Sequence, residues 1–270
     1  MLSVNLKVII RVIVIYILFS SCSFNKAYFD TSEHGVFFPD SLDYEEIYLS
    51  NRNGIKLYAC LMKPKTIPRG TVFLLSDNSG DVKLWYDVSS VMLKHGFQVF
   101  SFDYQGFGNS EGKPTHKNIL SDSQLMLNYL CKRDDIKNVP LIGWGFGIGG
   151  NLAVKLAYDN PYTFNYLILD SPTSSQRDMV LNNTSGLIRP FVFPFTVSQY
   201  ASKKLIQKIK KTPVLIVHSL EDQIVPYKMG EEVFQKANNP KLFFEALGPH
   251  GYTLIDYEKL YMERVEKLLH

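Results

Sequence analysis

The sequence is poor in the features that mark several classes of protein. Its 270 residues include only three cysteines, and the formal net charge is only +3. Cys60 and Cys131 fall in a predicted strand and a predicted helix, so we expect no disulfide framework. The basic residues are scattered, and the densest run, at residues 203–211, is typical of a solvated helix face. Without a basic stripe to hold a phosphate backbone, the chain has no expected nucleic-acid partner.

The N-terminus also lacks an apolar run long enough to cross a bilayer. Residues 8–19 form an apolar segment that Lys7 and Arg11 precede or interrupt, and it is shorter than the roughly 20 residues of a spanning helix. Two serines then lead directly into Cys22. Residues 1–22 thus resemble a lipoprotein signal peptide with Cys22 as the lipidated residue, which predicts a membrane-anchored, extracytoplasmic protein of the cell envelope. The alternative is a simple N-terminal membrane anchor with an ordinary buried Cys22.

Beyond a polar linker at residues 23–41, the pattern predicts one domain over residues 42–270. Two alternating runs, 44–50 and 55–62, flank Asn51-Arg52-Asn53-Gly54, and an Asn-Gly pair between such runs predicts an antiparallel hairpin.

Short, continuous apolar runs then alternate with longer amphipathic segments. Such runs are typical of strands buried on both faces, and they lie at residues 71–75, 98–102, 139–142, 166–169, 214–217 and 242–246. Helical periodicity occurs around residues 82–94, 116–131, 148–158, 228–237 and 253–269. The sequence therefore predicts an α/β fold with a mostly parallel, eight-stranded sheet, an N-terminal antiparallel hairpin and helices on both faces.

One long interval, residues 171–211, interrupts this alternation and is interpreted as a short cap insertion. It is rich in large apolar residues, namely Leu187, Ile188, Phe191, Phe193, Phe195 and Tyr200. The cap would either cover a pocket for an apolar ligand or pack on the sheet without contacting a ligand.

Four segments resemble α/β-hydrolases, and within them the BEM46-like and acyl-esterase serine hydrolases. They are Asp103-Tyr104-Gln105-Gly106-Phe107-Gly108-Asn109-Ser110-Glu111-Gly112, Leu169-Asp170-Ser171-Pro172, His218-Ser219-Leu220-Glu221-Asp222-Gln223-Ile224-Val225-Pro226 and Gly248-Pro249-His250-Gly251. The resemblance covers roughly residues 42–269. It implies the α/β-hydrolase fold, with Asp222 as the acid that orients the catalytic histidine and His250 as that histidine.

The nucleophile of this family belongs in a G-x-S-x-G turn between a strand and a helix. We align Gly143-Trp144-Gly145-Phe146-Gly147 with that turn, which places Gly145 at the serine position. Glycine tolerates the strained backbone of such a turn at little cost, but it cannot attack a carbonyl carbon. No covalent acyl-enzyme is expected.

The oxyanion loop departs from the family pattern as well. Where relatives have H-G-N, this chain has Ser76-Asp77-Asn78, and the backbone N–H groups of Asn78 and Phe146 are the expected oxyanion donors. A carboxylate at Asp77 would disfavour an oxyanion nearby. Asp77 or Ser79 as a substitute nucleophile is a minor alternative.

Three functions remain open from the sequence. The preferred one is a catalytically impaired hydrolase-like protein that holds a small apolar or acyl ligand, with neither a metal ion nor a cofactor. The second is an active esterase, lipase or thioesterase that uses a non-standard nucleophile or a water activated by His250. The third is a dinucleotide-binding oxidoreductase, because residues 145–150 also satisfy G-x-G-x-x-G, with Asp170 about twenty residues on.

Overall fold

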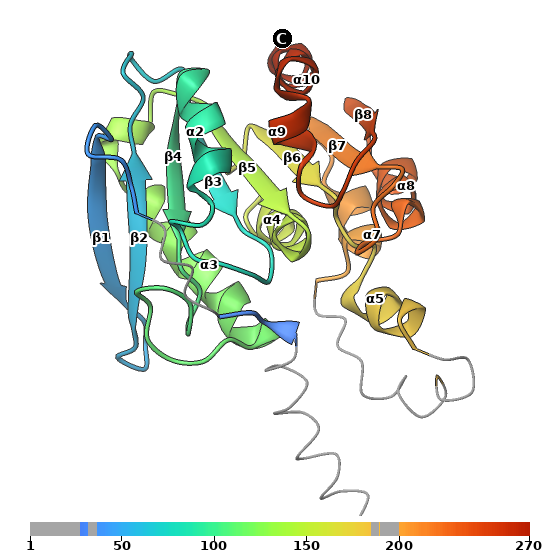
Figure 1. Ribbon diagram of the computed structural model, residues 1–270, viewed down its shortest axis with the longest axis horizontal. Helices are drawn as coiled ribbons and strands as arrows, with labels where there is room; N and C mark the ends of the chain where they lie inside the picture. Colours follow the sequence, from blue (N-terminus) through green and yellow to red (C-terminus); the bar gives the residue numbers. More distant parts are fainter. Residues whose placement is uncertain (1–27, 32–36, 185–188, 190–199) are drawn as a thin grey trace, which may run out of the picture.

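The computed structural model describes residues 28–31, 37–184, 189 and 200–270 (Figure 1). Eight strands form one sheet in the order β1-β2-β4-β3-β5-β6-β7-β8. Their bounds are β1 Tyr44–Ser50, β2 Lys56–Met62, β3 Gly70–Leu75, β4 Phe97–Phe102, β5 Leu141–Phe146, β6 Tyr166–Asp170, β7 Val214–Ser219 and β8 Lys241–Ala246. The β1–β2 and β2–β4 pairs are antiparallel, and all other neighbouring pairs are parallel. The predicted fold class is confirmed.

The helices cover both faces of this sheet (Figure 1). They are α2 Tyr86–Lys94, α3 His116–Leu130, α4 Ile148–Asp159, α5 Gln176–Asn182, α7 Ser202–Leu205, α8 Tyr227–Lys236, α9 Thr253–Asp256 and α10 Glu258–Leu269, with single 3-10 turns at Asp134–Ile136 and Ile206–Lys208. In β2, Leu57 and Leu61 join the core that contains α3 and α4, whereas Tyr58 and Met62 join the core that contains α2 and α10. Alternate side chains of a strand point to opposite faces, so this apolar run supplies two cores.

The predicted hairpin is present at the start of the sheet. Ser50 pairs with Lys56, and the Asn51 side chain accepts hydrogen bonds from the backbone N–H groups of Asn53 at 2.9 Å and Ile55 at 3.1 Å. Gly54 has a φ of 77°, a left-handed conformation that glycine adopts without a Cβ penalty.

The N-terminal residues that the structure describes are built into the domain. Phe29 is buried in the core beside Phe107, and the Asp30 backbone N–H donates to Asn78 O at 2.9 Å. Asp30 also forms a parallel bridge with Ser79. Part of the segment interpreted as a linker, 23–41, therefore packs against the loop that follows β3, because Phe29 has an apolar site to fill.

Four loops meet at one edge of the sheet. They follow the carboxyl ends of β3, β5, β7 and β8, which are mutually parallel and in register. In open α/β sheets this edge is where ligands bind, and it carries the predicted site residues that the structure describes.

Candidate active site

The turn from β5 into α4 has Gly147 at its tip. Gly147 has φ 51° and ψ −116°, and its backbone N–H donates to Asp170 O at 2.9 Å. A Cβ built on Gly147 would lie 3.2 Å from the Asp77 Cβ and 3.7 Å from the His250 Nε2. Position 147 is therefore the one that faces the imidazole.

The prediction that Gly145 occupies this place is wrong. Gly145 lies inside β5, paired with Leu75 and Leu169, and a Cβ there would meet the Gly149 carbonyl oxygen at 2.3 Å. The wrong assignment has two causes. The glycines at alternate positions fit the turn motif in two registers, and the strand was predicted to end at residue 142, whereas it ends at Phe146. Glycines weaken the pattern of a strand interior, although here they permit close approach of the following helix.

The same shift changes one predicted oxyanion donor. The residue after the turn tip is Ile148, the first residue of α4, and not Phe146. Phe146 is the last residue of β5 and packs against Trp85 with ring centroids 5.0 Å apart. The predicted start of the helix at residue 148 was the signal that could have identified both Gly147 and Ile148.

The predicted acid and histidine are brought together. His250 Nδ1 lies 2.7 Å from Asp222 Oδ2, with Asp222 in the loop after β7 and His250 in the loop after β8. The Asp222 side chain is fully buried, and the His250 side chain is 11% exposed. The other Asp222 oxygen, Oδ1, accepts hydrogen bonds from the backbone N–H groups of Ile224 at 2.9 Å and Val225 at 2.8 Å.

The acidic surroundings alter the protonation of this pair. Burial alone would lower the pKa of His250, but the hydrogen bond and charge of Asp222, with the charges of Asp77 and Asp170, outweigh burial and raise it. Burial would raise the pKa of Asp222, yet the hydrogen bond and charge of His250, with the backbone donors, hold it below its ordinary value. The arrangement favours an imidazolium–carboxylate pair.

A second histidine lies behind Asp222. His218 in β7 is fully buried, and its Nε2 lies 2.9 Å from Val225 O and 3.5 Å from Asp222 Oδ2. Burial lowers the pKa of His218 and outweighs its neighbours, which favours the neutral ring.

The loop after β3 places a carboxylate at the other side of the turn. Asp77 Oδ1 accepts from the Ser79 backbone N–H at 2.7 Å and from the Ser79 hydroxyl at 2.8 Å. Burial nevertheless raises the pKa of Asp77, against the lowering effect of these bonds and of His250. Asn78 is tied to the N-terminal segment, because its Nδ2 donates to Tyr28 O at 2.5 Å.

A third carboxylate, not predicted for this site from the sequence, lies next to the turn. Asp170 at the end of β6 is fully buried, and burial raises its pKa to about 6 against the opposing effect of His250. Its Oδ1 accepts from the Ser171 hydroxyl at 3.2 Å. His250 is thus faced by Asp222, Asp77 and Asp170.

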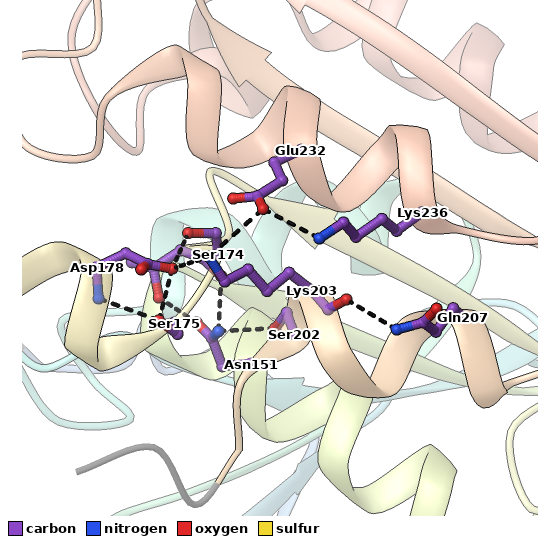
Figure 2. Close-up of polar contacts among 10 residues, drawn as sticks. Asn151, Ser174, Ser175, Asp178, Ser202, Lys203, Gln207, Glu232 and Lys236 are labelled. Atoms are coloured by element: carbon purple, nitrogen blue, oxygen red, sulfur yellow. Dashed lines mark hydrogen bonds and ion pairs between the residues drawn. The ribbon is translucent and has the colours of Figure 1, made fainter.

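The described ends of the segment interpreted as a cap, residues 171–211, are bonded to α4 and α8 (Figure 2). Asn151 on α4 donates from Nδ2 to the Ser202 hydroxyl at 2.7 Å. The Lys203 ammonium lies 2.8 Å from Asp178 on α5 and 3.4 Å from Glu232 on α8. This polar network holds residues 174–178 and 202–203 together against α4, the helix that follows the turn.

Two sequence predictions fall partly or wholly outside the described residues. Within the cap, Tyr200 is buried and its hydroxyl lies 2.6 Å from His116 Nδ1. Cys22 and the signal segment lie outside the described ranges, as do the cap residues Leu187, Ile188, Phe191, Phe193 and Phe195. Among the described residues, none of the helices combines the length and apolarity that crossing a membrane requires.

Comparison with known proteins identifies relatives of this chain. A family model described as serine aminopeptidase, S33 matches residues 66–207. The α/β-hydrolase domain-containing protein WAV2 of Arabidopsis thaliana is 30% identical over 223 residues, which cover 76% of this chain and 70% of WAV2. The uncharacterized membrane protein YNL320W of Saccharomyces cerevisiae is 27% identical over 230 residues, 80% of this chain and 78% of the relative.

Solved structures show the same fold. An esterase of Pyrococcus furiosus superposes with a TM-score of 0.70 at 19% identity, over 89% of this chain and 98% of the esterase. The sheet order, the turn before α4, the family match and the similarity to WAV2 agree. The chain belongs to the α/β-hydrolase superfamily, within the serine aminopeptidase S33 family.

Proposed function

We propose that this α/β-hydrolase-fold protein binds a small apolar or acyl ligand next to Gly147 and forms no covalent acyl-enzyme with it. The supporting observation is the glycine at the turn tip, with φ 51° and with His250 Nε2 3.7 Å from the point where a side chain would begin. A nucleophile at this position is what the Asp222–His250 pair would activate.

The roles follow from the geometry. In this proposal Asp222 orients His250, and the backbone N–H groups of Ile148, after the turn tip, and of Asn78, in the loop after β3, donate to a ligand oxygen. Asp77 opposes catalysis in this proposal, because its Cβ lies 3.2 Å from where a side chain at position 147 would begin, and an ionised carboxylate so near disfavours an oxyanion. The missing nucleophile at Gly147 and the unfavourable charge of Asp77 together support a protein that binds a ligand without turning it over.

We further propose that the chain is anchored in the cell envelope through a lipidated Cys22. The support is the sequence of residues 1–22 and the fact that the yeast relative is described as a membrane protein.

The chain carries a built-in reporter for ligand binding. Trp85 donates from its indole N–H to Ser79 O at 2.9 Å and packs on Phe146, so it contacts both the loop after β3 and the strand that leads to Gly147. The only other tryptophan, Trp144, is buried in β5. Titration with a medium-chain fatty acid should change the Trp85 emission, and the Trp85→Phe variant should show no such change.

The test of impaired catalysis uses the purified chain with short p-nitrophenyl esters and a fluorophosphonate probe. We expect hydrolysis at the solvent background and no covalent label. Turnover that disappears in His250→Ala, or labelling of any residue at the site, would reject the proposal.

One alternative has an observation in its favour. The short Asp222–His250 contact orients the ring of His250, which in its neutral form suits a general base that acts on a water beside Gly147. That mechanism predicts ester turnover that His250→Ala abolishes, with no covalent label. The dinucleotide alternative has no such support, since Asp170 is fully buried and its carboxylate cannot reach a ribose.

A further inference from the structure

Five large apolar side chains are exposed around the loops that carry Asp222 and His250. We call them the apolar rim, and they are Leu220, Ile224, Leu247, Tyr252 and Ile255, each between 41% and 58% exposed. They follow β7 and β8 and include the start of α9, at the same edge of the sheet as the turn (Figure 1).

Hydrogen bonds hold the two rim segments, those after β7 and β8, side by side. The Leu220 backbone N–H donates to Ala246 O at 2.9 Å, and that of Gly248 donates to Glu221 Oε2 at 2.8 Å. The Ile255 backbone N–H donates to Tyr252 O at 3.0 Å. Contiguous exposed apolar side chains mark interaction surfaces, whereas single ones need no explanation.

The chain connection points to what covers this surface. Tyr28 and Asp30 are bonded to Asn78, in the loop on the other side of Gly147. Cys22 precedes Tyr28 by only six residues, a length that spans at most about 20 Å when fully extended. An anchor at Cys22 therefore holds the edge of the sheet that carries the site close to the lipid.

The charges around the rim bear on the kind of lipid. Glu221 and Asp256 are exposed on the rim segments, and the exposed Lys228 and Lys259 lie just beyond them at the starts of α8 and α10, so the rim has no excess of positive charge. The exposed lysines Lys208, Lys210 and Lys211 line a cleft just before the amino end of β7, at the opposite edge of the sheet. Carboxylates at the contact are repelled by anionic headgroups and tolerated by zwitterionic ones.

We propose that the apolar rim docks on a zwitterionic bilayer surface, so that the site opens toward the lipid and takes its apolar ligand from the membrane. This inference rests on the proposed envelope anchor, and it adds the orientation of the domain and the source of the ligand.

The test is depth measurement on the full chain reconstituted in phosphatidylcholine vesicles that contain a nitroxide-labelled lipid. A bimane probe is attached at Leu247→Cys in a Cys131→Ser background, since Cys131 is exposed and Cys60 is buried. Matched probes at Ile67→Cys, a 92% exposed position before β3, and at Lys210→Cys report the opposite edge. The parent without an introduced cysteine gives the background label.

We expect several-fold stronger quenching at Leu247 than at Ile67 or Lys210, and weaker quenching at Leu247 when phosphatidylglycerol replaces phosphatidylcholine. Equal quenching at all three positions, or the strongest quenching at Lys210 with phosphatidylglycerol, would overturn the docking surface. Flotation of the vesicles separates this outcome from failure of the anchor, because an unanchored chain stays at the bottom of the gradient and overturns both proposals. A Leu220→Ser/Leu247→Ser variant should still float, with the probe at Ile224→Cys less quenched.

Discussion

Restoring a serine at the turn is the sharpest perturbation that this site allows. A serine at position 147 must adopt the left-handed backbone that Gly147 has, which costs about 1–2 kcal/mol. Its Cβ lies 3.2 Å from the Asp77 Cβ, so that neighbour must shift by a few tenths of an ångström. Domains of this kind have roughly 5–15 kcal/mol of stability, so Gly147→Ser should fold.

The expected gain is a reactive hydroxyl beside His250 Nε2. Loss of the nucleophile in a serine triad removes about 10⁶-fold in turnover, so even a small recovery stands clear of the background. Gly147→Ser should become labelled by a fluorophosphonate, and the added change His250→Ala should abolish the labelling. Replacing Asp77 by glycine in the same chain should speed the labelling, because it removes the carboxyl beside the developing oxyanion.

The matched control is Gly145→Ser. Its Cβ would meet the Gly149 carbonyl oxygen at 2.3 Å and the Gly150 nitrogen at 2.5 Å, and backbone atoms cannot rotate aside. Overpacking of this kind costs about 1–3 kcal/mol and occasionally more, so this variant should be the less stable in urea and should remain unlabelled. Labelling at position 145 but not at 147 would refute the assignment of the turn. Silence of a folded Gly147→Ser/Asp77→Gly chain would refute the claim that only the nucleophile and the Asp77 charge are at fault.

Three further predictions concern pH and packing. The folded-state pKa of His250 is raised, so the stability that it contributes is present below its unfolded pKa and is lost as the pH rises. The loss of unfolding free energy in His250→Ala should therefore be larger near about pH 6 than near about pH 9; a difference that does not vary with pH would contradict this. Burial lowers the pKa of His116 to about 4, so unfolding titrations should show roughly 3 kcal/mol lost between about pH 6.5 and 4; the same acid sensitivity in His116→Phe/Tyr200→Phe would assign it elsewhere. Phe29→Ala should cost about 3 kcal/mol in urea unfolding if the N-terminal segment is part of the core, and an unchanged midpoint would show that it is not.

The sheet could be predicted well because its signal is local. Most of the predicted strands begin and end within about two residues of the observed ones, since continuous apolar runs flanked by turn residues are typical of strands buried on both faces. The approach of Asp222 to His250 followed from the rule that parallel strands end at a common edge.

The register of the turn could not be predicted from the local sequence. Glycines at 143, 145, 147 and 149 look alike in the sequence, and what separates them is the tertiary contact that each makes. A Cβ at 143 would meet Leu167 and one at 149 would meet Leu75 O, whereas one at 147 meets only Asp77 and His250. The burial of Phe29 and the proximity of Asp170 to His250 likewise depend on packing between segments distant in the chain.

The bonding of Asp222 also bears on how relatives of this chain should be interpreted. Its carboxylate organises the 219–226 loop through Ile224 and Val225 in addition to holding His250. Selection for a folded loop alone can therefore preserve an aspartate here long after chemistry has ceased. In a sequence survey, an intact pair of aspartate and histidine would then be a poor indicator of an active enzyme. The residue at the turn tip would be the better indicator.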